Sequence, residues 1–471
     1  EQGSATIVML TNLEEKGRIK CNQYWPEGRT AVYGSIRIHT QEELTLADYT
    51  LRIFSLQREG SNEERIVKQF HFTVWPDHDV PDYPTALLHF VRKVSASNTE
   101  KSGPMVVHCS AGVGRTGTFI TLHSQMNRLR EERNIDVFAF VKGMRCQRCL
   151  MVQTERQYIF IHDALLEAIE CGDTDVSARD LNEQYRLLCA LNDTTQKTML
   201  QMEFEKINTT IHRKVAKDVG VLHYNRVKNR YTNIVPFDSH RCRMSIIPGV
   251  EGSDYINASL INGYHKPRAF IASQGPLPDT ADDFWRMVWE QKSSSIVMLT
   301  KEREGGKVKC HRYWPESGAE MHGPFQVILY GMHEYPEYTL REFKLIDSRD
   351  REGSIQFVKQ YQFTVWPDEG IPGNGVGIVD LIGQVQKWQR QCGDKPIVVH
   401  CSAGCGRTGT YVAISILLER LRTEGAVDVF HTVRTLRLQR EWMVQTELQY
   451  EFIYKTILEY LDSFELYSNF K

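Results

Sequence analysis

The chain of 471 residues lacks any long apolar run. No window holds the roughly 18 consecutive apolar residues that a helix needs to cross a bilayer. The N-terminus also has no charged start followed by an apolar core, which is the pattern of a secretory signal. We therefore expect a soluble chain without a targeting segment.

An excess of either charge is also missing. The chain has 57 Lys and Arg against 59 Asp and Glu, which gives a formal net charge of -2 and a pI near 6.8. Such a balance gives no electrostatic footprint for nucleic acid, so we expect no nucleic-acid partner. Any anionic substrate must be attracted by a local pocket.

Cysteines are few and irregularly spaced. Eleven of them are scattered through the chain, unlike the dense framework of a small secreted domain, so we expect a reducing compartment. Cys146 and Cys149 have the spacing of half a zinc site, but no second pair accompanies them. We therefore expect no metal and no cofactor.

What the chain does contain is a long repeat. The sequence His-Cys-Ser-Ala-Gly-x-Gly-Arg-Thr-Gly occurs at residues 108–117 and again at residues 400–409. The offset between the copies drifts only from 289 (314 minus 25) to 292 (401 minus 109), which indicates a duplicated domain rather than a short solenoid repeat. Two further segments recur in the same order: Phe-Thr-Val-Trp-Pro-Asp at 72–77 and 363–368, and Met-Val-Gln-Thr-Glu at 151–155 and 443–447.

The copies differ in length. Residue 1 aligns with residue 290, so residues 181–289 of the second copy have no counterpart in the first. We expect the chain to be a fragment whose N-terminal part is absent. The expected division is the C-terminal part of a first domain at 1–172, a polar linker at 173–180, and a complete second domain at 181–471.

The apolar pattern predicts an α/β fold. Runs rich in Val and Ile at 7–10, 105–107, 296–299 and 397–399 are typical of strands buried on both faces. Helical spacing of apolar residues follows the second and fourth runs. We expect in each copy a twisted mixed sheet flanked by helices, with the first copy incomplete.

The repeated segment predicts an oxyanion site with a nucleophile at its base. Cys109 and Cys401 lie at the end of a strand and before a helix, where the helix N-terminus and a nearby arginine both favour the thiolate. Arg115 and Arg407 match two oxygens of a phosphate, and the glycines let backbone N–H groups turn inward. The expected phosphate-binding residues are Ser110, Ala111, Gly112, Val113 and Gly114 in the first copy, and Ser402, Ala403, Gly404, Cys405 and Gly406 in the second.

Two other interpretations explain less of the sequence. The glycines also satisfy a dinucleotide-binding fingerprint, and Asp136 and Asp428 follow at about the distance that fingerprint requires. That fold has no need for a fixed Cys and Arg around the glycines. Alternatively, Cys109 and Cys401 are inert buried cysteines, but that leaves their recurrence between His and Ser-Ala-Gly unexplained.

These residues resemble the classical protein tyrosine phosphatases, and specifically the tandem intracellular region of receptor-type members. Gly-Asp-Thr at 172–174 and the C-terminal Tyr-Ser-Asn-Phe-Lys look most like the alpha/epsilon receptor subtype. The resemblance implies hydrolysis of phosphotyrosine-containing proteins at the cytoplasmic side of the plasma membrane. It also implies a membrane segment absent from this chain, and it allows contacts between domains or between copies of the protein.

The resemblance also implies roles for the repeated residues. Each cysteine would form a phosphocysteine, and the loop threonines Thr116 and Thr408 would stabilise its thiolate when it leaves. A mobile lid would carry an acid that later acts as a base. The remaining expected roles are, for the first and second copies, the lid acids Asp77 and Asp368, the water-positioning Gln153 and Gln445, and the assisting Gln157 and Gln449. For four further residues, a contact in the site and a place on the solvated surface are both open: Glu15 and Glu304, which would brace the arginine, and Lys20 and Lys309, which would contact the lid aspartate.

Selectivity for tyrosine is expected in the second copy only. The family builds a deep pocket with a Lys-Asn-Arg-Tyr loop, which here is residues 228–231, and Tyr231 would stack on the substrate ring. We therefore expect activity from the second copy. The alternatives are a phosphatase-like binding or regulatory module, and a dual-specificity phosphatase.

Four arginines near the glutamine segments have two open roles. Arg145 and Arg148, like Arg437 and Arg440, are expected either to hold a second anion or to pair with surface carboxylates.

Overall fold

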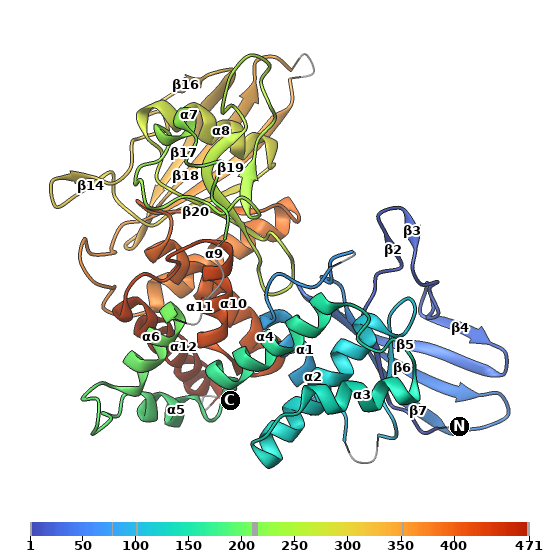
Figure 1. Ribbon diagram of the computed structural model, residues 1–471. Helices are drawn as coiled ribbons and strands as arrows, with labels where there is room; N and C mark the ends of the chain where they lie inside the picture. The colour runs from blue at the N-terminus through green and yellow to red at the C-terminus, as the bar shows by residue number, and fades with distance from the viewer. Residues whose placement is uncertain (1, 78, 100–101, 210–214, 351–352, 469–471) are drawn as a thin grey trace. The chain divides into compact units, whose positions relative to one another are not determined.

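A computed structural model describes residues 2–77, 79–99, 102–209, 215–350 and 353–468. The chain forms two compact units, residues 1–173 and residues 174–471. Each unit contains a mixed sheet flanked by helices (Figure 1). The predicted α/β fold class is confirmed.

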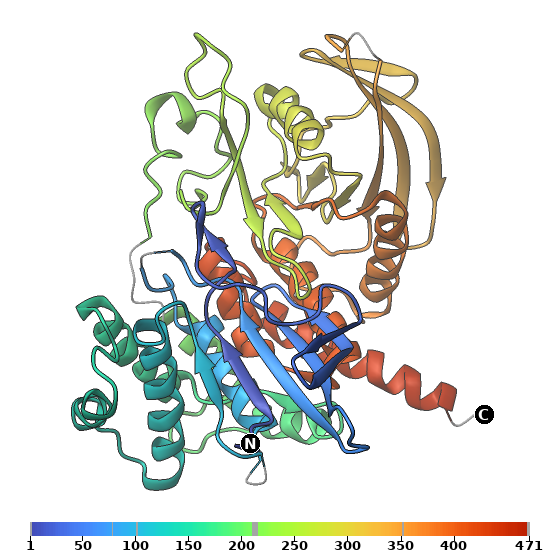
Figure 2. The same cartoon turned by 90° about the vertical axis from the view of Figure 1, so that its right-hand side faces the viewer.

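In the first unit the strand order is β4-β5-β6-β7-β1-β8. β1 is parallel to β7 and β8, and the remaining pairs are antiparallel. The blue strands and the cyan helices of this unit are seen from a second direction in Figure 2. The elements are β1 (Thr6–Met9), β2 (Glu14–Glu15), β3 (Arg18–Ile19), β4 (Thr30–Tyr33), β5 (Ile36–Thr45), β6 (Tyr49–Arg58), β7 (Glu64–Phe72), α1 (Thr85–Ser97), β8 (Val106–His108), α2 (Gly114–Glu132), α3 (Val137–Gln147) and α4 (Glu155–Cys171).

The second unit repeats this order and extends it, as β10-β11-β12-β20-β13-β19-β18-β17-β16. Its elements are β9 (Val176–Ser177), α5 (Leu181–Leu188), α6 (Met199–Thr209), α7 (His223–Arg226), β10 (Arg241–Arg243), β11 (Tyr255–Ile261), β12 (Phe270–Ser273), η1 (Pro278–Thr280), α8 (Ala281–Glu290), β13 (Ser295–Met298), β14 (Arg303–Glu304), β15 (Lys307–Val308), β16 (Ala319–His322), β17 (Phe325–Glu334), β18 (Tyr338–Asp347), β19 (Ile355–Phe363), α9 (Val376–Cys392), β20 (Ile397–His400), α10 (Gly406–Glu424), β21 (Ala426–Val427), α11 (Val429–Gln439) and α12 (Glu447–Ser468).

The strands that deliver the two cysteines differ in burial. β20 lies between β12 and β13 and is buried throughout, as the sequence predicts. β8 is an edge strand, and Val106 is 46% exposed. The prediction that residues 105–107 are buried on both faces is therefore wrong. The reason is that β12 covers one side of β20, and no described strand of the first unit takes the corresponding place beside β8.

Most of the segment assigned to a linker belongs to the second unit. β9 pairs with β21, and Thr174 Oγ1 donates a 2.7 Å hydrogen bond to Asp428 Oδ1. Asp175 forms a 2.9 Å ion pair with Arg420. Thr174 and Asp175 lie just after Asp173, the last residue of the first unit, so these contacts belong to the second unit.

None of the helices in the described part of the chain combines the length and the hydropathy that a membrane span requires.

The core of the second unit gives a stability prediction. Phe343 on β18 is fully buried among aromatic and aliphatic side chains, whereas Phe357 on β19 is 47% exposed. Phe343→Ala should lower the free energy of unfolding by about 3–5 kcal/mol, because it leaves a cavity. Phe357→Ala should cost less than about 1.5 kcal/mol, the value of its edge-on contact with Tyr330. Urea unfolding checks both, and equal losses would contradict the assignment of the core.

Candidate functional site

The loop between β20 and α10 has the geometry of an anion cradle. Cys401 directly follows the strand, and α10 begins at Gly406. The N–H of Gly404 points to Cys401 Sγ at 3.3 Å. Gly404 has φ +71°, and a Cβ there would lie 2.2 Å from the carbonyl oxygen of Ser273, so only glycine fits. The sulfur therefore lies against a loop N–H group, and the N-terminus of α10 follows in the same loop.

The first copy builds the same cradle. The N–H of Gly112 lies 3.3 Å from Cys109 Sγ, and Thr116 Oγ1 donates to the sulfur at 3.2 Å. Burial opposes ionisation, but the hydrogen bonds from Thr116 and the loop N–H groups outweigh it and lower the pKa of Cys109. In the second copy, Thr408 Oγ1 is buried without a hydrogen-bond partner among the described residues.

The loop arginine is held by a buried glutamate in both copies. Arg407 Nη1 and Nη2 donate to the two carboxylate oxygens of Glu304, each at 2.8 Å. Arg115 does the same with Glu15, at 2.6 and 2.8 Å. The predicted bracing pairs therefore form. A bidentate pair of this kind fixes the plane of the guanidinium as well as its position.

The acid of this pair stays ionised to low pH. Burial alone would raise the pKa of Glu304, but the hydrogen bond from Arg407, the N–H of Lys301 and the charge of Arg407 together lower it to about 2. Thr300 Oγ1 also donates to the carboxylate, at 2.9 Å.

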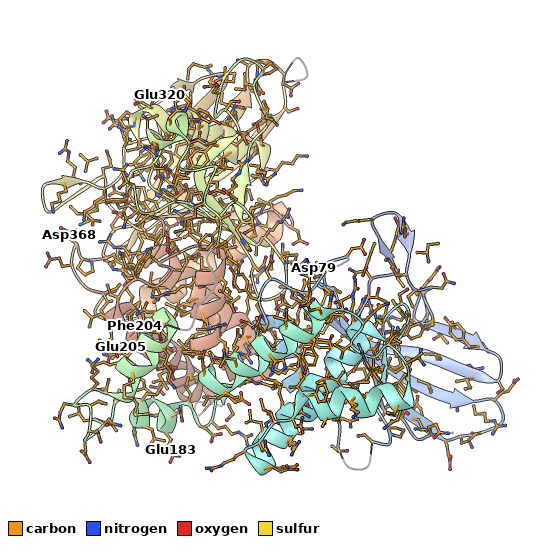
Figure 3. All side chains as sticks on the ribbon, viewed as in Figure 1. Asp79, Glu183, Phe204, Glu205, Glu320 and Asp368 are labelled. Atoms are coloured by element: carbon orange, nitrogen blue, oxygen red, sulfur yellow. The ribbon has the colours of Figure 1, made fainter. Side chains whose placement is uncertain are left out.

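The same arginines also contact the lid segments, which carry Trp-Pro-Asp at residues 75–77 and 366–368. Arg407 Nη2 donates to the carbonyl oxygen of Pro367 at 2.9 Å, and Arg115 Nη2 donates to that of Pro76 at 3.2 Å. The predicted lid lysines also meet their aspartates. Lys309 Nζ is 2.9 Å from Asp368 Oδ1, and Lys20 Nζ is 3.3 Å from Asp77 Oδ1. Asp368 and, in the other lid, Asp79 are labelled in Figure 3. In both units the lid carbonyl, the lid aspartate and the cradle arginine are thus brought together.

A cavity of about 410 Å³ collects the predicted groups of the first copy. The glutamines pack on the cradle: a Cβ on Gly114 would lie 2.9 Å from Gln157 Nε2 and 3.3 Å from Gln153 Oε1. The predicted residues in its wall are Glu15, Lys20, Asp77, Cys109, Ser110, Ala111, Gly114, Arg115, Gln153 and Gln157.

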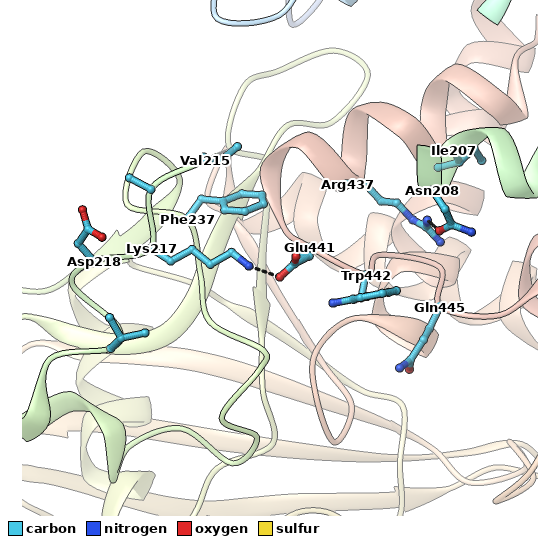
Figure 4. Close-up of a pocket in the computed structure, with 12 residues that line it drawn as sticks. Ile207, Asn208, Val215, Lys217, Asp218, Phe237, Arg437, Glu441, Trp442 and Gln445 are labelled. Atoms are coloured by element: carbon cyan, nitrogen blue, oxygen red, sulfur yellow. Dashed lines mark hydrogen bonds and ion pairs between the residues drawn. The ribbon is translucent and has the colours of Figure 1, made fainter. Parts of the chain in front are cut away.

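The second copy places its glutamines in the same way. A Cβ on Gly406 would lie 3.0 Å from the amide atoms of Gln449 and 3.3 Å from Cβ of Gln445. Gln445 is exposed and also borders a second cavity of about 1040 Å³. Figure 4 shows this cavity with Trp442 beside Gln445, and Lys217 paired with Glu441.

Tyr231 lies at the rim of the second cradle. Its hydroxyl is 2.9 Å from Ser402 Oγ, and the side chain is 39% exposed. The segment that carries it is fixed, because Arg230 donates to the carbonyl oxygens of Gly275 and Pro276. The tyrosine is therefore held beside the cradle loop with a partly exposed side chain.

Cys405 is a predicted loop residue that does not offer its side chain to the cradle. Cys405 is fully buried with Sγ 3.6 Å from the carbonyl oxygen of Ala403, and burial raises its pKa to about 11. Val113 occupies the same place as the N-cap residue of α2. The contribution of Cys405 to the cradle is therefore limited to its backbone.

The histidine before each cysteine is an orienting group. His400 Nε2 is 2.8 Å from the hydroxyl of Tyr313, and Nδ1 faces the carbonyl oxygen of Cys401 rather than its sulfur. Burial lowers the pKa of His400 to about 4, so the imidazole is neutral near pH 7. The histidine therefore orients the backbone of the loop and does not contact the sulfur through Nδ1.

The role of the four extra arginines differs from both expectations. Arg440 is 1% exposed and donates to the carbonyl oxygens of Gly404 and Ala403, to Ser259 and to Asn257. Arg148 donates to the carbonyl oxygen of Ala111 in the same way. Arg145 and Arg437 donate to the carbonyl groups before the glutamines. These arginines therefore hold backbone carbonyl groups of the two loops. Because the arginines recur in both copies of the sequence, their recurrence could have indicated a structural role.

Two segments of the chain, residues 1–167 and 225–459, match the family model described as protein-tyrosine phosphatase. The chain belongs to the protein-tyrosine phosphatase family. It is 51% identical over 471 residues to receptor-type tyrosine-protein phosphatase F of Danio rerio, covering 99% of this chain and 24% of that protein. It is 48% identical to tyrosine-protein phosphatase Lar of Drosophila melanogaster, covering 100% of this chain and 23% of that protein.

The subtype is not fixed by the short segments noted in the sequence. Receptor-type tyrosine-protein phosphatase alpha of Mus musculus is 46% identical, covering 100% of this chain and 57% of that protein. That identity is lower than the identity to the F relative, so the linker and C-terminal segments do not assign this phosphatase chain to the alpha/epsilon subtype. The chain spans about a quarter of the F and Lar relatives.

The arginine–glutamate pair predicts a pH-dependent stability. Because the pKa of Glu304 is about 2 in the folded state and near 4.3 when unfolded, its contribution is complete above about pH 5. It is lost as the pH falls toward 2. Glu304→Gln should therefore cost on the order of 2 kcal/mol at pH 7, and the difference from the parent chain should shrink between about pH 5 and 2.

Urea unfolding at a series of pH values measures this difference. Glu334→Gln, which removes one negative charge from an exposed side chain of β17, serves as the control. A loss in Glu304→Gln that does not change with pH would contradict the assignment.

Proposed function

We propose that this chain is the catalytic part of a receptor-type protein-tyrosine phosphatase that hydrolyses phosphotyrosine through a cysteinyl phosphate, chiefly at its second copy. The observation that carries the proposal is the assembly around Cys401. The thiol accepts the N–H of Gly404, Arg407 of the same loop donates to the lid at Pro367, and the lid aspartate Asp368 pairs with Lys309. The names of the relatives support the same activity.

In the first step the thiolate of Cys401 attacks phosphorus and the bond from phosphorus to the phenol oxygen breaks. Arg407 and the loop N–H groups hold the phosphoryl oxygens, which gain negative charge in the transition state. Protonated Asp368 donates its proton to the departing phenol oxygen. The products of the step are a free tyrosine side chain, a phosphocysteine and the carboxylate of Asp368.

In the second step water attacks phosphorus and the bond from sulfur to phosphorus breaks. Asp368, now a base, accepts a proton from this water, and Gln445 is placed to orient it. Inorganic phosphate leaves and the Cys401 thiolate is restored. Thr408 stands at the position of Thr116, whose hydroxyl donates to the sulfur in the first copy, and its hydroxyl stabilises the departing Cys401 thiolate in the same way.

Selectivity for phosphotyrosine over phosphoserine follows from the depth of the pocket around the cradle. Tyr231, joined to Ser402, forms a wall against which a phenyl ring can stack, worth about 0.5–1.5 kcal/mol beyond area burial. A short serine phosphate gains nothing from that wall, which disfavours the dual-specificity alternative. In the first copy the described residues include no counterpart of this tyrosine loop.

A binding-only role for the second copy is not favoured. Its described residues retain Cys401, Arg407, Asp368 and Gln445 in one site. As a proposal from the relatives, the chain acts at the cytoplasmic side of the plasma membrane on phosphotyrosine-containing proteins.

The proposal assigns turnover to one cysteine. Cys401→Ser should lower hydrolysis of a phosphotyrosine peptide by at least about a thousandfold, because it removes the nucleophile. Cys109→Ser, the matched change in the first copy, should leave hydrolysis nearly unchanged. Release of inorganic phosphate measures both, and the opposite pattern would overturn the assignment.

A trapping variant separates turnover from binding. Asp368→Ala should bind the peptide as the parent chain does while hydrolysing it slowly. A parent chain that binds the peptide and never releases phosphate would instead establish the binding-module alternative.

A further inference from the structure

The turn between β14 and β15 differs between the copies at one position. The second copy has Gly305 and Gly306, where the first has Lys16 and Gly17. All four residues have positive φ, at 53°, 75°, 47° and 75°. Because Lys16 adopts nearly the same left-handed conformation as Gly305, the backbone of this turn does not need a glycine at that position.

The lid aspartate Asp368, rather than the turn, requires a glycine at position 305. A Cβ on Gly305 would lie 2.3 Å from Asp368 Oδ2 and 3.5 Å from its Cγ. Favourable contacts between heavy atoms lie near 3.5–4.0 Å, so a side chain at 305 and this carboxylate position exclude each other. A Cβ on the neighbouring Gly306 would meet no atom of the described residues within 4 Å.

Asp368 is held in this place by two further contacts. Lys309 Nζ lies 2.9 Å from Asp368 Oδ1, and Arg407 Nη2 donates to the carbonyl oxygen of Asp368 at 3.3 Å. The backbone and one carboxylate oxygen are thus anchored. The other oxygen lies in the space that the missing side chain of Gly305 leaves open.

The lid acid of the first copy, where Lys16 stands at the position of Gly305, is placed differently. Asp77 Oδ1 is 3.3 Å from Lys20 Nζ, and its side chain is 8% exposed, against 35% for Asp368. The two copies therefore differ both in one residue of this turn and in the exposure of the lid aspartate.

We infer that Gly305 is a positioning residue for the lid acid of the second copy, because its lack of a side chain lets the carboxylate of Asp368 lie against the turn beside Lys309. The inference rests on the proposed function. Misplacing a reacting group by about 1 Å can cost as much as a hundredfold in rate. The loss falls mainly on substrates whose leaving oxygen must be protonated.

The test compares two aryl phosphates in the full chain carrying Cys109→Ser. Phenyl phosphate has a poor leaving group and needs the acid, whereas 2,4-dinitrophenyl phosphate leaves with little protonation. Gly305→Ala and Gly305→Lys, which installs the residue of the first copy, should raise the ratio of the kcat/KM on the dinitrophenyl ester to the kcat/KM on the phenyl ester by about tenfold, because kcat/KM reports phosphocysteine formation, the step in which the acid protonates the leaving oxygen. Gly306→Ala, which places a methyl group at a neighbouring positive φ without the contact, should leave the ratio unchanged.

The ratio is insensitive to partial unfolding, because loss of folded chain lowers both rates equally. An unchanged ratio in the active Gly305 variants, or an equal rise in Gly306→Ala, would overturn the role of Gly305 while leaving the proposed function intact. Absence of turnover that depends on Cys401 in the parent chain would overturn the proposed function itself, and the inference with it.

Discussion

The bidentate pair between Arg407 and Glu304 is the contact on which the second site depends. The guanidinium also donates to the carbonyl oxygens of Leu299 and Pro367. One side chain thus joins the end of β13, the turn at β14, the lid and the phosphate loop. A cation fixed in this way can meet a dianion without reorganising, which is the condition for electrostatic stabilisation of a transition state. Arg115 and Glu15 reproduce the arrangement in the first copy.

The two copies share this cradle but differ in what supports it. Arg440 reaches Asn257 and Ser259 of β11 and is fully buried, whereas Arg148, which has one hydrogen bond to the loop, is exposed. Strand β12 also closes the cradle from behind, since the carbonyl oxygen of Ser273 lies against Gly404. The strands before α8 therefore rigidify the phosphate loop as well as widening the sheet.

Much of this site could be predicted from the sequence, because its chemistry lies in short repeated segments. The cradle, the lid aspartates and the bracing glutamates were all expected, and the structure brings them together. The contacts that escaped prediction join residues far apart in the chain. Arg440 binds β11 over more than a hundred residues, β8 becomes an edge strand for want of a neighbour, and Gly305 matters only because Asp368 folds back onto it. A local sequence pattern does not indicate which distant residues become neighbours in the fold.

The central claim is that Cys401 carries the phosphoryl group during turnover. Rapid acid quench of the chain mixed with a phosphotyrosine peptide, followed by digestion and mass spectrometry, tests it directly. We expect one added phosphoryl group on the peptide that contains Cys401, and its disappearance once substrate is exhausted. A phosphoryl group found only on another residue, or steady hydrolysis in which the Cys401 peptide never carries one, would contradict it.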